Sequence, residues 1–259
     1  MIGQKKVVVV MPGYNVERTL ERTYRAIPPG VVDDVLLVDD GSHDRTAEKA
    51  RELGISCYRH ATNKGYGASQ KTGYQAALDR GAEVVVMLHP DDQYPAELIP
   101  ALACLVASGV FHVGLGSRLL GTGQVRRGMP RYKYLSNRLW TFGQNLCLRQ
   151  RLAEYHTGFR AFSREFLLGV PMLENSDDFL FDNQVLLQAV YFGYPIGELA
   201  VPARFTHDCS SMSPWRGIDY GLGVMAATGQ YLLQRAGFVH AAMFNPGGRR
   251  FTANATSGA

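Results

Sequence analysis

The stretch Val7-Val8-Val9-Val10-Met11-Pro12-Gly13-Tyr14-Asn15 decides the fold, because a run of apolar, mostly β-branched residues ends abruptly in proline and glycine. A short apolar run bounded by turn residues is typical of a strand buried on both faces. Similar runs occupy Val35–Val38, Ile55–Tyr58 and Val84–Leu88, and a helical pattern separates each run from the next. Strands that alternate with helices predict an α/β fold with a mainly parallel central sheet flanked by helices.

The spacing of apolar residues predicts the helices. Val16, Leu20, Tyr24 and Ile27 recur on one helix face, and Pro28-Pro29-Gly30 ends that helix. The remaining elements are expected in this order: a helix capped by Ser42 or Asp44 that ends near Leu53, helices at Ala68–Leu78 and Ala96–Ala107, a strand at Val110–Gly116, helices at Leu135–Leu148 and Phe179–Tyr191, and a strand at Ile196–Phe205.

Composition and length favour one globular domain. The chain has 259 residues, of which 46% are hydrophobic and 19% charged, so it is neither disordered nor membrane-embedded in composition. Its cysteines lie far apart without a CxxC pair, which favours a reducing compartment over a disulfide framework or a zinc site. No signal peptide and no apolar run of spanning length is present, so a cytoplasmic protein is expected.

Charge is distributed unevenly along the chain, although the net charge is only +4. Between Leu98 and Ala153 there is no Asp or Glu. A basic surface that only faces solvent usually carries acidic residues as well. Because this segment has none, it favours a phosphate or an anionic lipid as partner. Nucleic acid is disfavoured because no aromatic stacking pattern accompanies the basic residues. The basic residues of the segment are Arg118, Arg126, Arg127, Arg131, Lys133, Arg138, Arg149 and Arg151.

Two turns at strand ends carry carboxylates, and in open α/β sheets ligands bind outside the carboxyl ends of the strands. Asp39 and Asp40 follow one strand directly, and carboxylates suit the N–H donors of a nucleobase and the hydroxyls of a ribose. The alternative is that Asp40-Gly41-Ser42 is only a turn and a helix cap. This edge of the sheet is therefore the predicted site for a nucleoside.

Asp91, Asp92 and Gln93 follow the next buried strand. Extended geometry sends alternate side chains the same way, so Asp91 and Gln93 are expected on one side and Asp92 on another. An incomplete set of oxygen ligands is what Mg²⁺ or Mn²⁺ uses when a diphosphate fills the remaining positions. The alternative is an exposed acidic turn ahead of Pro95.

Six ordered motifs resemble glycosyltransferase family 2, and within it the polyprenyl- or dolichyl-phosphate sugar synthases, over about residues 5–205. Each motif is short, but their order and spacing together are specific. The motifs are Pro12–Glu17, Val38–Ser42, Asn63–Ala68, the turn containing Asp91, Gly116–Arg118 and Thr157–Phe162.

The resemblance implies a GT-A, Rossmann-like fold and an inverting transfer from a UDP- or GDP-sugar to a polyprenyl phosphate, assisted by Mg²⁺ or Mn²⁺. It implies one GT-A domain at 1–245, with a nucleotide-sugar half at about 1–117 and an acceptor half at about 118–245. Residues 246–259 are expected to form a flexible tail. By position it assigns the nucleoside end of the donor to Pro12, Tyr14, Glu17, Asp39 and Asp40, the metal to Asp91 and Gln93, and the phosphates of donor or acceptor to Arg118, Arg131 and Ser136.

Two departures from the family pattern stand out. His89 occupies the first position of the usual Asp-x-Asp, and imidazole suits softer ions than Mg²⁺, so its role as a ligand and the identity of the ion stay open. Glu154-Tyr155-His156 precedes Thr157, where many lipid-phosphate enzymes of the family carry an aspartate.

The acceptor decides whether a catalytic base is needed. A phosphomonoester arrives as an anion and needs only positioning, whereas a hydroxyl must lose a proton. For a hydroxyl acceptor, in glycan or natural-product synthesis, Asp182 is the first candidate base and His207 the second. With a lipid acceptor, a peripheral contact with the cytoplasmic membrane face through Arg126, Arg127, Arg131 and Lys133 is expected.

Two further function classes are open alternatives. A sugar-phosphate nucleotidyltransferase has a phosphate loop like Gly114–Arg118, but that loop should follow the first strand. A non-catalytic module that binds a sugar nucleotide or an anionic lipid is favoured by His89. A nicotinamide dehydrogenase is excluded, because no glycine-rich turn follows the first strand.

Overall fold

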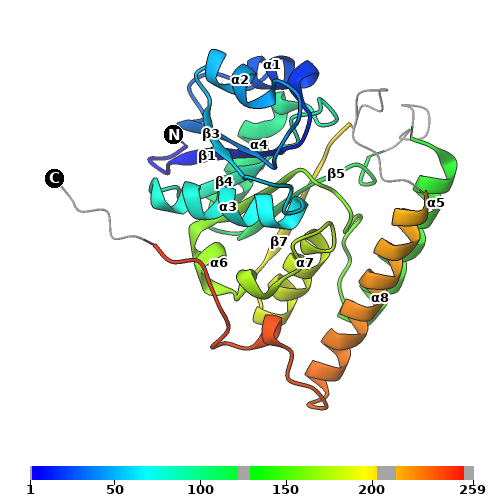
Figure 1. Cartoon of the computed structure of the whole chain (residues 1–259). Coiled ribbons are helices and arrows are strands. Elements are labelled where there is room, and N and C mark those ends of the chain that lie inside the picture. The colour runs from blue at the N-terminus through cyan, green and yellow to red at the C-terminus, as the bar shows by residue number, and fades with distance from the viewer. Residues whose placement is uncertain (1, 122–128, 203–213, 254–259) are drawn as a thin grey trace.

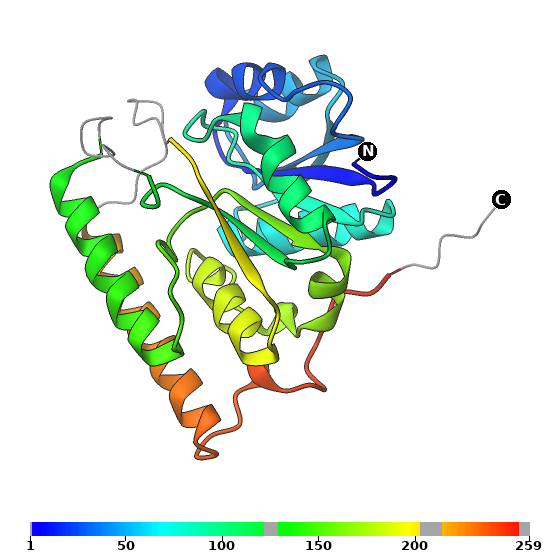
Figure 2. The same ribbon diagram turned by 180° about the vertical axis from the view of Figure 1, so that it is seen from behind.

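The computed structural model describes residues 2–121, 129–202 and 214–253. Within those residues, seven strands form one sheet in the order β3-β2-β1-β4-β6-β5-β7. Helices cover both faces of the sheet (Figures 1 and 2). The strands are β1 (Val7–Gly13), β2 (Asp34–Asp39), β3 (Ser56–Arg59), β4 (Val84–Met87), β5 (Val113–Ser117), β6 (Arg160–Ser163) and β7 (Ile196–Ala200).

The helices alternate with the strands in the first half of the chain and dominate the second. Short 3₁₀ turns precede α4 and punctuate the C-terminal half. The helices are α1 (Glu17–Arg25), α2 (Thr46–Glu52), α3 (Tyr66–Asp79), α4 (Ile99–Ala107), α5 (Arg131–Leu148), α6 (Arg164–Gly169), α7 (Phe181–Phe192) and α8 (Pro214–Arg235), and the 3₁₀ turns are η1 (Ala96–Leu98), η3 (Met172–Glu174) and η4 (Ala242–Phe244).

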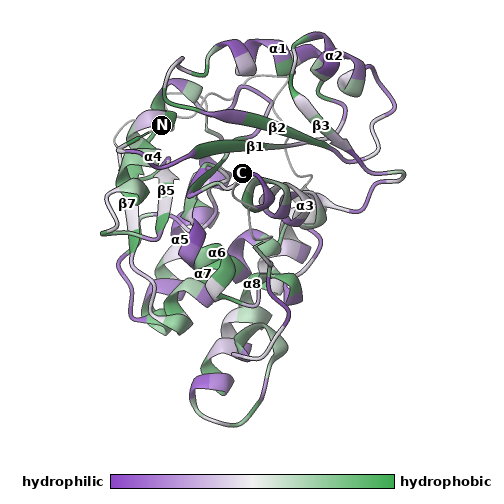
Figure 3. Ribbon diagram, turned by 90° about the vertical axis from the view of Figure 1, so that its left-hand side faces the viewer, coloured by the Kyte–Doolittle hydropathy of each residue, from purple (hydrophilic) through white to green (hydrophobic). Residues whose placement is uncertain are grey.

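The prediction of a mainly parallel α/β sheet is confirmed. β1 pairs in parallel with β2 and β4, β2 with β3, and β5 with β7, while β6 lies antiparallel between β4 and β5. Hydropathy follows this layering, because the central strands β1 and β2 are hydrophobic whereas α1 and α2 carry hydrophilic outer residues (Figure 3).

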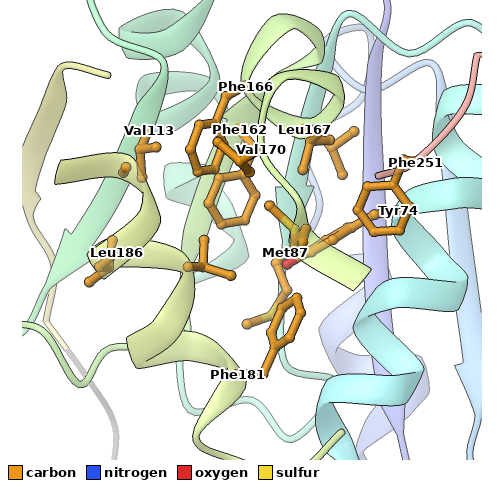
Figure 4. Packing of buried hydrophobic residues seen from close by; sticks show 14 of the residues in the cluster. Tyr74, Met87, Val113, Phe162, Phe166, Leu167, Val170, Phe181, Leu186 and Phe251 are labelled. Carbon is orange, nitrogen blue, oxygen red and sulfur yellow. The ribbon is translucent and has the colours of Figure 1, made fainter. Parts of the chain in front are cut away.

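Alternate residues of β1 enter two different cores, as the period of a strand requires. Val8 and Val10 belong to the core that includes residues of α3 and α7, and Val7 and Val9 belong to the core that includes residues of α1, α2 and α4. The approach of α3 is close, since a Cβ at Gly73 would lie 2.2 Å from the Val10 side chain. The first core contains the aromatic residues in Figure 4, including Tyr74, Phe162 and Phe181.

Several parts of the C-terminal half differ from the sequence-based expectation. β6, α6 and α8 were not predicted, and the strand expected at Ile196–Phe205 ends at Ala200, with its last expected residues outside the described part of the chain. The segment expected to be a tail from Pro246 is packed at its start. Phe251 is 4% exposed and stacks edge-on against Tyr74 with ring centroids 6.4 Å apart, so this aromatic anchor holds the chain on the core.

Among the described helices, none is long and apolar enough to cross a membrane.

Candidate functional site

A cleft with a volume of about 1690 Å³ opens at the carboxyl ends of β1, β2 and β4 and continues beneath α5 and α8. It brings together most of the residues predicted from the sequence. Glu17, Asp39 and Arg131 do not line it, and His207 lies outside the described residues. The predicted residues that line the cleft are Pro12, Tyr14, Asp40, His89, Asp91, Gln93, Arg118, Ser136 and Asp182.

The Asp39-Asp40 turn is held by hydrogen bonds within the protein. Asp40 accepts from the backbone N–H groups of Lys64 and Gly65, each at 2.9 Å, and its Oδ1 lies 2.7 Å from His60 Nδ1. Asp39 is fully buried, accepts from Ser42 N–H at 2.9 Å and lies 3.2 Å from the Nε of Arg59. These carboxylates therefore fix the backbone beside the cleft.

Glycine is required at the centre of this turn. Gly41 has a φ of 75°, and a Cβ there would lie 2.9 Å from backbone atoms of Thr62 and Asn63. The following residue, Ser42, is not a helix cap, because its hydroxyl accepts the backbone N–H of Asn15 at 2.8 Å. The turn thus joins the ends of β1 and β2 into one rigid rim.

Asp91 and Gln93 line the cleft and Asp92 does not, as predicted, but the reason differs from the one expected. β4 ends at Met87, and a left-handed residue, Asp92 with a φ of 59°, turns the chain. Its carboxylate lies 2.9 Å from Arg22 Nε, on the side away from the cleft. Asp91 is buried and accepts the backbone N–H of Gln93 at 3.1 Å.

A metal ion at this turn would need oxygen ligands beyond the side chains that the described residues supply. Within the described residues no group of three or more His, Cys, Asp and Glu side chains is arranged to hold an ion. Asp91 and Gln93 offer two oxygen-bearing side chains on the cleft surface. Such a set fits Mg²⁺ or Mn²⁺ that takes its other ligands from a diphosphate and water.

His89, the departure from the family pattern, is engaged in a hydrogen-bond chain. Its Nε2 lies 3.0 Å from the hydroxyl of Tyr66, which donates to Asp182 Oδ2 at 3.1 Å. Because the tyrosine has one proton to give, His89 must donate through Nε2–H. Burial, followed by the charge of Asp182, raises the pKa of Tyr66 well above its usual value, so the hydroxyl keeps its proton. In this tautomer Nε2 carries the proton and offers no lone pair to a metal ion.

The room for the His89 ring comes from Gly158, where a Cβ would lie 2.2 Å from Nε2. The ring stacks on Tyr66 with centroids 5.3 Å apart. At the other end of the chain, Asp182 accepts a second hydrogen bond, from Gln70 Nε2 at 2.9 Å. Both carboxylate oxygens of the predicted base therefore already have partners in the protein.

A buried ion pair that the sequence did not predict supports the opposite wall. Arg118 Nε donates to Glu154 Oε1 at 2.8 Å, and its Nη2 donates to Glu154 and to the backbone carbonyl of His156. Asn137 adds a hydrogen bond to the same carboxylate at 2.8 Å. The available signal in the sequence was that Glu154 is the first acid after the long acid-free stretch.

The charge state of this pair follows from its surroundings. Burial raises the pKa of the fully buried Glu154 carboxyl, but the Arg118 charge and hydrogen bonds outweigh burial and hold that pKa below its usual range. The carboxylate is thus ionised and fixes the guanidinium at the cleft surface. The pair joins the end of β5 to the segment that leads into β6.

His156 and Tyr220 form a second contact that the sequence did not predict, because Tyr220 lies on α8. Their Nδ1 and hydroxyl atoms are 2.9 Å apart. Burial lowers the pKa of His156 to about 4, so the imidazole is neutral near pH 7. Burial also raises the pKa of Tyr220, so this pair contributes no charge to the cleft.

The other predicted phosphate ligands lie on α5. Ser136 is exposed, lines the cleft and donates to the carbonyl of Lys133 at 3.2 Å. Arg131, the first residue of α5, is exposed and lies outside the cleft lining.

The family model described as Glycosyl transferase family 2 matches residues 8–169, which include β1 to β6 and the Asp91 turn. The chain belongs to this family. The resemblance predicted from the six motifs is therefore confirmed, and the protein is a glycosyltransferase. Membership of this family argues against the two alternative functions, a sugar-phosphate nucleotidyltransferase and a non-catalytic binding module.

Curated relatives cover most of the glycosyltransferase. A polyprenol monophosphomannose synthase from Mycolicibacterium smegmatis is 30% identical over 213 residues, covering 78% of this chain and 78% of the relative. A dolichyl-phosphate hexose transferase from Haloferax volcanii is 28% identical over 214 residues, covering 82% of this chain and 88% of the relative.

Solved structures confirm the GT-A fold. Glucosyl-3-phosphoglycerate synthase from Mycobacterium tuberculosis, in complex with Mn²⁺, UDP-glucose and phosphoglyceric acid, superposes with a TM-score of 0.67 at 19% identity. The match covers 92% of this chain and 82% of that one. At 19% identity this similarity supports the fold and no further property.

Proposed function

We propose that the glycosyltransferase moves a sugar, with inversion, from a UDP- or GDP-sugar to a polyprenyl phosphate. The observation that supports this acceptor is the engagement of Asp182, whose two oxygens accept hydrogen bonds from Tyr66 and Gln70. His156 is a poor base near neutral pH, because its pKa is lowered to about 4. An acceptor that arrives as an anion needs no base, and a lipid phosphate is such an acceptor.

The relatives support the same acceptor class by name. The Mycolicibacterium smegmatis relative is named for polyprenol monophosphomannose and the Haloferax volcanii relative for dolichyl phosphate. Such an acceptor resides in a membrane, so we propose a peripheral position on the cytoplasmic membrane face. We also propose that residues 1–117 bind the nucleotide sugar and residues 118–245 the acceptor.

The donor is proposed to bind along the rim formed by the ends of β1 and β2. Pro12, Tyr14 and Asp40 line the cleft there, and Tyr14 is 45% exposed at its mouth. Glu17 and Asp39 do not line the cleft, so their proposed role is indirect. Glu17 accepts the backbone N–H of Arg45 at 3.2 Å, so both carboxylates shape the nucleoside site through the backbone.

A divalent ion is proposed to bind Asp91 and Gln93. When bound, Mg²⁺ or Mn²⁺ neutralises charge on the departing nucleoside diphosphate. Structures of the Mycobacterium tuberculosis synthase contain Mn²⁺ or Mg²⁺ together with UDP, which supports this requirement. The chain's own contribution is to hold Asp91 in a buried turn, facing the phosphates.

The phosphates are proposed to meet Arg118, Ser136 and Arg131. Arg118 lines the cleft with its guanidinium held by Glu154 and the His156 carbonyl through Nε and Nη2, so Nη1 is the nitrogen that can donate to a phosphate oxygen. Arg131 stands outside the lining, so its proposed role is to attract the anion as it approaches.

The neighbouring residues Asp91 and Asp92 provide a matched test. We expect Asp91→Asn to lower metal-dependent transfer by about two to three orders of magnitude, as loss of one oriented electrostatic group does. Asp92→Asn should retain most activity, because asparagine tolerates a left-handed φ and Asp92 pairs with Arg22 outside the cleft.

The measurement is release of nucleoside diphosphate from UDP- and GDP-sugars, with polyprenyl phosphate or with a hydroxyl acceptor, and with or without a chelator. Full activity of Asp91→Asn in the presence of chelator would remove the metal assignment. Transfer only to a hydroxyl would replace the lipid-phosphate proposal by glycan or natural-product synthesis.

A further inference from the structure

The outer face of α5 carries a continuous row of exposed apolar side chains. Their spacing of three and four residues places them on one side of the helix. The opposite side is buried and meets α7, where Gln144 hydrogen-bonds to Asn183 at 3.1 Å. The exposed residues are Tyr132 (62%), Leu135 (70%), Leu139 (65%), Phe142 (69%) and Leu146 (73%).

α8 extends the same face. It lies beside α5 in both views of the molecule (Figures 1 and 2), and Gln144 reaches Thr228 on α8 at 3.2 Å. The buried side chains described on α8 are Val224, Ala227, Thr228 and Tyr231, whose spacing of three and four residues places them on one side of the helix. The exposed apolar residues follow the same spacing on the other side. These are Leu222 (55%), Met225 (48%), Leu232 (42%) and Leu233 (47%). The two helices thus form a layer with an apolar outer surface, which we call the α5–α8 face.

Basic residues border this face. Arg131 and Arg138 are exposed and follow one flank of the apolar row on α5, since an offset of 7 residues corresponds to nearly two helical turns, and the exposed Arg149 follows the helix directly at its C-terminal end. No acid occurs between Leu98 and Ala153, and Asp219 is the acid of α8. An apolar stripe flanked by arginines is the pattern of a helix that lies in the interface of a bilayer, with its charged heads reaching the lipid phosphates.

The α5–α8 face is continuous with the cleft. Tyr132, Leu222 and Met225 belong to the exposed row and also line the cleft. Further in, the lining continues with Ser136 and Arg118. An apolar chain lying on the face thus leads to donors that fit its phosphate.

We propose that the α5–α8 face docks on the surface of an anionic bilayer, and that the acceptor's prenyl chain reaches the cleft from the bilayer over Tyr132, Leu222 and Met225. The inference rests on the proposed lipid-phosphate acceptor and deepens it by naming the route of entry. The flanking arginines favour anionic lipid over a second copy of the chain, because two copies would bring like charges together.

Vesicle flotation of the full chain tests the docking. We expect binding to vesicles of phosphatidylcholine with phosphatidylglycerol, and about tenfold weaker binding for Leu139→Glu/Phe142→Glu/Leu146→Glu, whose sites lie outside the cleft lining. Arg138→Glu/Arg149→Glu should remove the preference over phosphatidylcholine alone. The matched control is Val110→Glu, an equally exposed apolar site that is 63% exposed before β5, which should bind as the parent does.

Equal vesicle binding by the triple variant and the parent would overturn the proposal. So would a parent that ignores vesicles and dimerises in analytical ultracentrifugation while the triple variant stays monomeric, which would make the face an interface between copies. Circular dichroism checks that each variant is folded.

Transfer assays separate this inference from the proposed function. The triple variant should retain transfer to a short-chain, water-soluble prenyl phosphate and lose most transfer to a long-chain polyprenyl phosphate in vesicles. If the parent uses neither acceptor but binds vesicles through the face, the proposed function fails and the docking surface stands. If both acceptors are used equally by parent and variant, the function stands and the entry route fails.

Discussion

The two walls of the cleft are built in different ways. On the side proposed for the donor, Asp39 accepts the backbone N–H of Ser42 in its own turn, and Asp40 accepts those of Lys64 and Gly65 from another turn. On the side proposed for the acceptor, Arg118 is fixed by the buried Glu154. The first wall is held by several hydrogen bonds between carboxylates and backbone, and the second depends on one buried charge pair.

This difference predicts how each wall tolerates change. In the first wall the stabilisation is divided among several hydrogen bonds to carboxylates, each worth about 1.5–3 kcal/mol. A buried pair that loses one partner leaves a full charge without compensation, which costs about 3–5 kcal/mol. The acceptor wall should therefore be the more fragile part of the site.

The largest effect is expected for Glu154→Gln. The substitution keeps the shape but leaves the Arg118 charge uncompensated, so we expect the free energy of unfolding to fall by about 3–5 kcal/mol in urea denaturation. The donor wall should survive, so that a UDP- or GDP-sugar that protects the parent still raises the melting temperature.

The control for this variant is Arg118→Met/Glu154→Leu, which removes both charges. It should regain most of the lost stability while transfer stays impaired. If Glu154→Gln unfolds within about 1 kcal/mol of the parent, the pair is not what holds the acceptor wall.

A smaller effect is expected from the pH dependence of His156. Its pKa is lowered by burial from 6.5 to about 4, so between these values the unfolded chain binds a proton that the folded chain does not. Stability should therefore fall as the pH falls from 6.5 towards 4, by at most about 3 kcal/mol.

His156→Gln isolates this contribution, because glutamine does not titrate and can still hydrogen-bond to Tyr220. Urea midpoints measured across the same pH window should fall less steeply for the variant than for the parent. Parallel slopes would show that the imidazole titrates equally in both states. The loss attributed to Glu154 lies at lower pH, below the ordinary carboxyl pKa, because its own pKa is lowered.

The sequence could predict the donor wall because its signals are local. The apolar run that begins at Val7 and the turn residues after each strand specify parallel strands whose ends converge. The sequence correctly predicted that Asp91 and Gln93 share one side and that Asp92 lies on another, but the reason was wrong. The left-handed backbone at Asp92 separates these side chains, whereas the prediction relied on an extended strand. Positive φ at a non-glycine residue leaves no clear mark in a single sequence.

The acceptor wall was beyond local reasoning. Glu154 meets Arg118 and His156 meets Tyr220 only after β6 and α8 are in place, and neither element was predicted. β6 consists of four residues, and they lie within a motif that was interpreted as part of the family pattern and not as a strand. α8 contains glycines, which lower helix propensity. Side chains brought together by tertiary packing need the fold before their partners can be named.

The smallest effect is expected for Asp182→Asn, and it decides between the acceptor classes. If the acceptor is a phosphate, the residue serves only to hold its protein neighbours, which are Tyr66, Gln70 and the buried Arg160 with its Nη2 at 3.9 Å, and we expect a change of about threefold or less in the kcat of the folded variant. A catalytic base for a hydroxyl acceptor is worth about 10²–10⁴-fold. Tyr66→Phe is the matched control, because it frees one oxygen of Asp182 and leaves the carboxylate in place. A large loss in Asp182→Asn alone, with a flattened pH–rate profile, would identify Asp182 as a base and shift the proposed acceptor from a lipid phosphate to a hydroxyl.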